Sequence, residues 1–244
     1  MPAPVYPSVE PAVRHLDCRR AVHVAAATIL TLVAVCATRS DAADVILNAA
    51  TGTRVGAFAL VADSASATGT AVTLANAGRP KVLTAVAAPA DYLELTFTAD
   101  ATTPYHLWVR MRAQSDSYAN DSIHVQFTNV STGAIGTTSS QIVNLEDSSG
   151  AGVSGYGWQD NGYGTGVMGP DIVFSQGGAQ RLRIQNREDG FVIDQIVLSS
   201  STYLRKSPGL LKNDQTVFTS ANVIRVHDVQ PNAQSLRMTE AILT

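Results

Sequence analysis

The apolar residues of this chain come in short runs in which they alternate with polar residues. The alternation is strict in 92–98, 105–113 and 180–186, and Gly, Pro, Asn and Asp separate such runs. A period of two places one face of a strand on a core and the other in water, which is the pattern of an antiparallel sheet. No long apolar period of 3.6 residues appears in the body of the chain. We therefore expect an all-β fold, an antiparallel β-sandwich that spans residues 43–202.

The first forty residues have a different pattern. Basic residues precede an apolar stretch at 21–38, and the small residues Ser40 and Ala42 follow it. This is the layout of a secretory signal peptide, so we expect residues 1–42 to form a signal helix that is cleaved off and the protein to be secreted. The alternative is an uncleaved N-terminal membrane anchor, because 21–38 reaches the lower limit of a membrane span. Both cysteines lie in this segment, so the mature protein is expected to contain no disulfide.

Charge and motifs argue against several classes of function. The net charge is −3 and 15% of the residues are charged, a poor match for a polyanion, so no nucleic-acid partner is expected. The fingerprints of serine hydrolases, zinc proteases and P-loop enzymes do not occur in the sequence. Adjacent acidic residues on a strand point to opposite faces, so no glycosidase pair and no enzyme activity are expected. His106 and His124 fall on the polar faces of expected strands, far apart in sequence, and we expect them to be exposed.

Glycine is concentrated in one part of the chain. Twelve of the 18 glycines fall between residues 133 and 178, and 148–170 is the densest stretch. This stretch also contains Tyr156, Trp158 and Tyr163, although aromatic residues make up only 6% of the chain. Aromatic side chains among glycines either anchor a long loop to the core or form an exposed binding platform. The sequence leaves both interpretations open.

Asp194 interrupts the apolar run FVIDQIVL. A period of two places its side chain beside Val192 and Ile196, and a carboxylate in such surroundings needs a partner because burying an unpaired charge is costly. The partner is a cation, an arginine or a set of backbone N–H groups, and a structural calcium would suit an oxygen ligand here. The alternative is a surface aspartate at a sheet edge.

Four segments together resemble a known family: YHLWVRMRA, YANDSIHVQF, GYGWQDNGYG and QRLRIQNREDGFVIDQIVLS. They are similar to secreted bacterial carbohydrate-binding modules, galactose-binding-like β-sandwiches of the family six and family thirty-five type, over about 44–204. The resemblance implies a jelly-roll of two antiparallel sheets, often with a structural calcium, that stacks a sugar ring on loop aromatics. Trp158 matches the loop tryptophan of such modules. The candidate ligand-binding residues are Trp158, Tyr163, Tyr156, Tyr118, Asn120, Asp160, Asn161, Asn186 and Asp189.

Two positions depart from the family pattern. The family commonly has glutamate calcium ligands in the first strand, whereas NAATGT at 48–53 contains none. Asp194 matches the aspartate of the last strand and is the candidate calcium ligand that the resemblance implies. Val192 stands where a sugar-binding Asn often sits. Either Asn186 or Asp189 compensates for it, or the usual sugar-binding cleft of the family is inactive in this chain.

The resemblance implies a monomeric, non-catalytic module that binds a poly- or oligosaccharide. One alternative is a structural or adhesive β-sandwich without sugar affinity. Another is an accessory domain of a truncated secreted hydrolase, because 203–244 has the composition of a linker followed by a strand-like run at 222–229, as at the start of a downstream catalytic domain.

Overall fold

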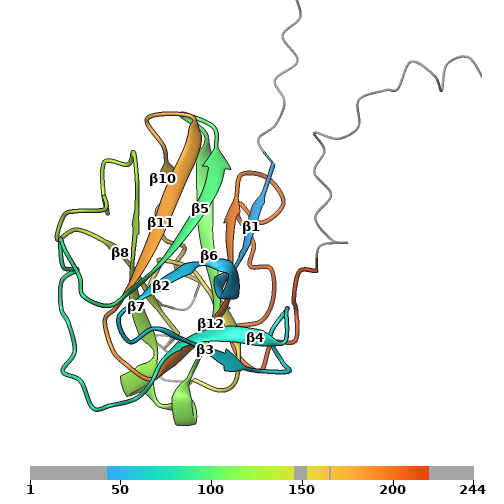
Figure 1. Ribbon diagram of the computed structural model, residues 1–244. Helices are drawn as coiled ribbons and strands as arrows, with labels where there is room; N and C mark the ends of the chain where they lie inside the picture. Colours follow the sequence, from blue (N-terminus) through green and yellow to red (C-terminus); the bar gives the residue numbers. More distant parts are fainter. Residues whose placement is uncertain (1–42, 146–152, 165, 220–244) are drawn as a thin grey trace, which may run out of the picture. The chain divides into compact units, whose positions relative to one another are not determined.

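The computed structural model describes residues 43–145, 153–164 and 166–219, and these form an all-β fold of two antiparallel sheets (Figure 1). The segments expected to be a signal or anchor (1–42) and the start of a following domain (222–229) lie outside the described residues. Within the described part of the chain, no helix is long and apolar enough to cross a membrane.

The seven-stranded sheet has the order β10-β6-β12-β4-β3, with β1 paired to β12 and β9 paired to β6. Its strands are β1 (Val45–Asn48), β3 (Ala59–Ala62), β4 (Thr70–Leu74), β6 (Pro104–Ala113), β9 (Gly157–Gln159), β10 (Ile172–Val173) and β12 (Phe191–Ser199). The five-stranded sheet has the order β2-β5-β11-β7-β8. Its strands are β2 (Thr53–Val55), β5 (Tyr92–Ala99), β7 (Ser122–Phe127), β8 (Gln141–Asn144) and β11 (Gly178–Asn186). The short 3-10 turns are η1 (Ala49–Thr51), η2 (Gln114–Asp116) and η3 (Tyr118–Asn120).

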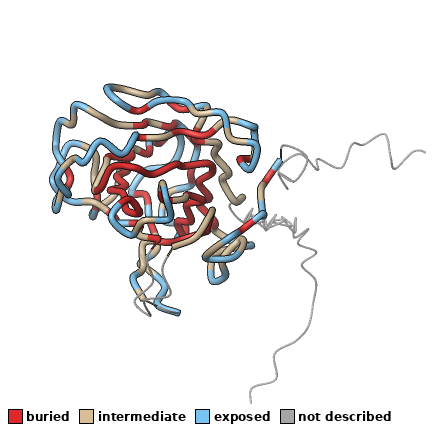
Figure 2. Tube along the Cα trace, turned by 90° about the horizontal axis from the view of Figure 1, so that it is seen from below, coloured by how far each residue is buried: buried red, intermediate tan, exposed pale blue. Residues whose placement is uncertain are grey.

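The main core lies between the two sheets, as the alternation predicts. Alternate apolar residues of β5 and β6 belong to it, together with side chains from β7, β11 and β12 in one continuous cluster. Figure 2 shows the buried residues gathered in the interior of the fold. Phe174 lies within this cluster and makes edge contacts with Phe97, Tyr105 and Phe127. The prediction of an antiparallel β-sandwich is therefore confirmed in its coarse form.

A β-bulge at Asp194 reverses the face of the sheet to which each later side chain of β12 points. Ile193 pairs with Met111 and Gln195 pairs with Arg110, so Asp194 is an extra residue without a partner of its own on β6. Ile196 consequently points into the main core. The prediction that Ile196 shares a face with Asp194 is wrong, because an inserted residue shifts the period of two by one position.

Two further segments cover the outer face of the seven-stranded sheet. One is the loop that follows β9; the other is residues 203–219, which we call the C-terminal strap. Trp108, Trp158, Val197 and Phe218 form a second apolar cluster there, against which Tyr203 packs. The expectation of a linker from residue 203 onward is thus corrected for 203–219, which is packed chain that buries Asp214 and Phe218.

The loop between β4 and β5, residues 75–91, covers the outer face of the five-stranded sheet. His124 on β7 is fully buried, its Nε2 lies 2.9 Å from the carbonyl oxygen of Val82, and its Nδ1 lies 2.8 Å from the hydroxyl of Ser140. Gln185 on β11 bonds both backbone groups of Val86. His124 and His106 are both fully buried, so the prediction that they are exposed is wrong, because these loops cover the polar faces of their strands.

Candidate functional site: a cleft beside the C-terminal strap

Trp158 is an anchor in this structure and not an exposed platform. Its side chain has no exposed surface, its ring packs on Phe218 with centroids 5.6 Å apart, and its Nε1 donates to the carbonyl of Thr216. Tyr156 is also buried, with its hydroxyl donating to Asp63. A ring with both faces covered offers nothing for a sugar to stack on. The stacking roles expected of Trp158 and Tyr156 therefore do not fit their positions.

Asp160 fixes the glycine-rich loop to the sheet. One carboxylate oxygen accepts the backbone N–H of Gly162 and the other accepts that of Gly169, while His106 Nε2 lies 2.9 Å from the latter oxygen. Burial raises the pKa of Asp160, but the hydrogen bonds from His106 and the two glycines outweigh burial and hold that pKa below its usual value. Asp160 is thus an ionised loop anchor with both oxygens in use.

His106 extends this anchor to the strap. Its Nδ1 lies 3.1 Å from the carboxylate of Asp171, and Asp171 in turn accepts two hydrogen bonds from Arg205 at 3.0 and 2.7 Å. The series Asp160–His106–Asp171–Arg205 thus joins the loop, β6 and the strap, from the buried His106 to the exposed Arg205.

The loop closes on itself at a glycine. A side chain on Gly162 would place its Cβ 2.2 Å from the carbonyl oxygen of Val167, so only glycine fits there. Asn161 holds the same turn, because its amide donates to Gln141 and to the carbonyl of Pro170. Tyr163 follows Gly162 and is 57% exposed.

A cleft of about 240 Å³ opens between this loop and the strap. Polar groups of Gln159, Asp160 and Ser207 line it beside the indole of Trp108. Of the eleven exposed large apolar side chains in the described residues, five belong to the two segments that form this cleft. They are Tyr163, Val167, Met168, Leu210 and Leu211. We call these five residues the apolar rim.

The other predicted ligand-binding residues lie at the opposite end of β6. The Asn120 amide donates to the carbonyl of Gln114, just after β6 ends at Ala113, whereas the cleft's anchor His106 lies seven positions earlier. Seven strand residues span about 23 Å. Asn120 therefore shares no site with Asp160, Asn161 and Tyr163.

Asp189 and Tyr118 lie near Asn120, whereas Asn186 lies at the end of β11. Asp189 is buried and accepts the N–H groups of Ala77 and Arg79, beside the turn at Gly190 that Asn120 touches. Tyr118 lies on η3 next to Asn120 and is 70% exposed. Asn186 is half-buried at the end of β11. The structure thus divides the predicted set into one group on the glycine-rich loop and another near Asn120.

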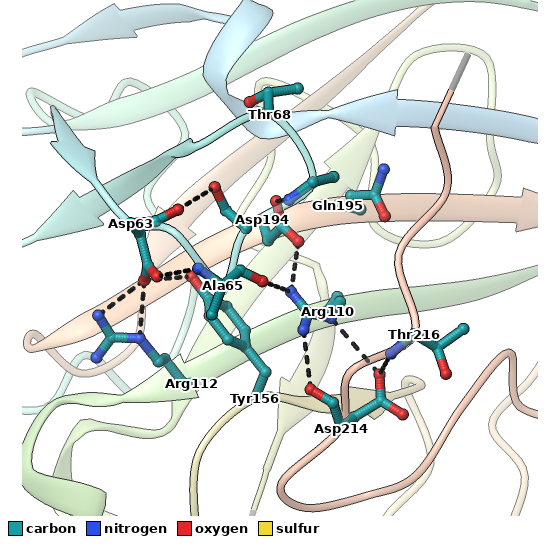
Figure 3. Close-up of polar contacts among 12 residues, drawn as sticks. Asp63, Ala65, Thr68, Arg110, Arg112, Tyr156, Asp194, Gln195, Asp214 and Thr216 are labelled. Carbon is teal, nitrogen blue, oxygen red and sulfur yellow. Dashed lines mark hydrogen bonds and ion pairs between the residues drawn. The ribbon is translucent and has the colours of Figure 1, made fainter. Parts of the chain in front are cut away.

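Asp194 has an arginine partner. One carboxylate oxygen accepts the N–H of Ala67 at 2.9 Å, and the other lies 2.5 Å from Arg110 Nη1 (Figure 3). Of the partners that the sequence allows, the structure has the arginine together with a backbone N–H group. Within the described residues, no group of three His, Cys, Asp or Glu side chains is placed to hold a metal. Arg110 and the Ala67 N–H thus occupy both oxygens of Asp194, in the place where the resemblance implied a calcium ion.

Sequence reasoning missed most of the cleft. Val167, Met168, Ser207 and Leu211 lie in stretches without strand periodicity, and no motif marks them. The available signal was apolar side chains placed among glycines and turn residues, such as VMGP and GLL. Apolar residues in such surroundings are often exposed, and a group of them indicates an interaction site.

No family model and no curated protein matches this chain. Among solved structures, it is similar to the C-terminal family 6 carbohydrate-binding module of a marine laminarinase from Zobellia galactanivorans, with 11% identity and a TM-score of 0.42. That alignment covers 64% of this chain and 98% of the module. A family 35 module from Clostridium thermocellum is 16% identical with a TM-score of 0.35, and the alignment covers 64% of this chain and 98% of that one.

Longer enzymes also contain a similar part. An exo-β-1,3-galactanase from Phanerochaete chrysosporium is 13% identical with a TM-score of 0.37, and the alignment covers 64% of this chain. The chain spans 29% of the length of that galactanase. Modules of the kind that the sequence resembles are thus among its structural matches, at low identity and low TM-score.

Proposed function

We propose that this protein is a secreted, non-catalytic carbohydrate-binding module with a jelly-roll fold, and that it holds a unit of a poly- or oligosaccharide in the cleft beside the strap. The observation that carries the proposal is the apolar rim around a cleft with polar groups inside it. A pyranose has an apolar face of C–H groups and a rim of hydroxyls, so it needs this combination of surfaces.

The cleft assigns different roles to its residues. Tyr163 lies between Gly162 and Gly164, which line the cleft, and in this proposal its exposed ring takes the C–H face of a sugar while Met168 and Leu211 extend the apolar contact. Gln159 and Ser207 are the uncharged polar residues of the lining and are proposed to bind sugar hydroxyls, although Gln159 Nε2 and Ser207 Oγ also form hydrogen bonds within the protein. Asp160 contributes indirectly, because both of its oxygens already accept hydrogen bonds from the protein. Drug-sized ligands fill pockets of about 300–1,000 Å³, so a cleft of about 240 Å³ suits one sugar unit.

A pair of exposed tyrosines tests the site. Tyr163→Ala removes the ring between Gly162 and Gly164, which line the cleft, whereas Tyr118→Ala removes an even more exposed ring at the far end of β6. On a glycan array followed by calorimetry, we expect Tyr163→Ala to weaken binding about tenfold, because a stacked ring contributes about 1.5 kcal/mol. Tyr118→Ala should bind like the wild type. Equal binding by both variants would show that the cleft is not the site, and a wild type that binds no glycan would refute the function.

The rim also favours a second candidate, a structural or adhesive module. Four of its five side chains are aliphatic, with Leu210 66% exposed and Val167 56% exposed. Exposed aliphatic groups of this kind are typical of surfaces that contact another protein, including a neighbouring catalytic domain. This candidate predicts that Leu210→Ser abolishes binding to such a partner, measured by calorimetry, while glycan binding is absent from the start.

The proposal includes export. The motif at 21–42 supports a signal peptide that is cleaved after Ala42, so secreted protein should begin at Ala43. Mass spectrometry of the N-terminal peptide checks this expectation. An intact residue 1 in a membrane fraction would support the anchor instead.

A further inference from the structure

Arg110 lies among oxygen atoms in the interior. Its side chain is fully buried on β6, and its guanidinium lies 2.5 Å from Asp194 Oδ2, 3.1 Å from the carbonyl of Ala65 and 2.9 Å from the carbonyl of Asp214. Its Nε is 3.6 Å from Asp214 Oδ1. The ring of Tyr156 covers one face, with the guanidinium carbon 4.1 Å from the ring centroid. Figure 3 shows this arrangement.

The oxygen atoms come from three segments that are far apart in sequence. Ala65 belongs to the turn after β3, Asp194 is the bulged residue of β12, and Asp214 belongs to the strap. A single positive group therefore joins two parts of the seven-stranded sheet to the segment that covers it. The β-bulge contributes to this arrangement, because the inserted residue brings the Asp194 carboxylate to Arg110.

Two carboxylates and two carbonyl oxygens form the kind of donor set that a hard divalent cation prefers. Here the protein satisfies all of them. Ala67 N–H occupies the second oxygen of Asp194, and the N–H groups of Thr216 and Leu210 occupy the two oxygens of Asp214, each at 2.7 Å. The guanidinium of Arg110 supplies the remaining hydrogen bonds to these oxygens and the positive charge.

We propose that Arg110 is a built-in cation, which occupies an internal cation site and makes the fold independent of calcium. Two buried, ionised carboxylates without a positive partner are strongly unfavourable, so a cation at this place keeps the pair ionised without the uptake of a proton. A guanidinium meets the requirement with fixed donors that need no supply from outside. The proposal concerns the fold and does not depend on the ligand of the cleft.

The wild type gives the first test, by thermal unfolding of the full chain with excess calcium or with a chelator. We expect the same melting temperature in both, because the site is already filled. A rise of more than about 3 °C with calcium would overturn the proposal.

Variants of Arg110 give the second test. Arg110→Ala leaves an anionic cavity, so its melting temperature should fall steeply and should partly recover when calcium or guanidinium ion is added in low excess. The control is Arg112→Ala on the same strand, whose guanidinium pairs with Asp63 and is 32% exposed. This variant should lose less and recover nothing. Absence of any recovery in Arg110→Ala would show that the cavity is no cation site.

A third comparison applies even if Arg110→Ala does not fold. Arg110→Lys keeps the charge with fewer donors, and Arg110→Met keeps the bulk without the charge. We expect the lysine variant to melt several degrees above the methionine variant. Equal melting, or a more stable methionine variant, would show that positive charge is not what the site requires.

Discussion

At the scale of single residues, the two tryptophans of this protein hold the strap in place by hydrogen bonds. Trp158 Nε1 donates to the carbonyl of Thr216 at 3.1 Å, and Trp108 Nε1 donates to the carbonyl of Tyr203 at 2.8 Å. Each indole thus combines apolar burial with one hydrogen bond to the covering segment, which suits a buried aromatic residue with a polar group. Both tryptophans of the chain therefore stabilise the wall of the cleft.

Replacing Trp158 should consequently unfold the protein more easily. Trp158→Ala removes a fully buried ring and leaves a cavity against Phe218, so we expect the free energy of unfolding to fall by about 3–5 kcal/mol. Urea unfolding followed by circular dichroism measures the loss. The exposed Tyr163 provides the control, because its alanine variant should stay within about 0.5 kcal/mol of the wild type. An unchanged midpoint in Trp158→Ala would contradict the anchoring role.

The sequence could predict that Asp194 needs a partner but not which partner it has. Its place in an apolar run already makes an unpaired carboxylate costly. The partner, Arg110, is 84 residues away and is brought to it by the pairing of β6 with β12. The bulge that aims the carboxylate has no signature in FVIDQIVL, since a strict period of two fits that run equally well. Long-range pairing, not local pattern, determines this contact.

At the scale of elements, the strap is the feature that local pattern conceals. Its buried residues, Asp214 and Phe218, are isolated among turn residues, so the segment shows no strand period. It also satisfies its backbone by loop-to-strand bonds, such as Trp158 N–H to the carbonyl of Leu210 and Asp214 N–H to that of Tyr156. The strands were predictable because the alternation of apolar and polar residues within each strand shows which side chains are buried. The burial of the strap follows only from its contacts with other segments, which its own sequence does not show.

Deleting the strap should expose the second apolar cluster. A chain that ends after Thr202 uncovers Trp108, Trp158 and Val197, so we expect it to bind an apolar dye and to melt at least about 8 °C lower. The matched control ends after Thr219 and keeps the whole strap. Melting curves and dye fluorescence compare the two chains. If the shorter chain melts with the control and binds no dye, the strap is no structural part of the sandwich.

At the scale of the whole molecule, buried charge makes stability depend on pH. Burial lowers the pKa of His124 below its ordinary 6.5, and the positive charge of Arg187 acts in the same direction, against the hydrogen bond to Val82. Burial raises the pKa of Asp171, but hydrogen bonds from Arg205 and His106 outweigh it and hold that pKa below its usual value. In both cases the unfolded chain binds protons more readily than the folded protein does, so acid favours unfolding.

The two kinds of group act in different pH ranges. The contribution of His124 is complete above pH about 6.5 and is lost as the pH falls toward the lower pKa of the folded state. Carboxylates such as Asp171 begin to add their own loss only below pH about 4. Urea unfolding over a pH series should therefore show two separate declines in the free energy of unfolding. His124→Gln keeps a donor and an acceptor but does not titrate, so it should remove the upper decline and leave the lower one. An upper decline that persists in this variant would assign it to another group.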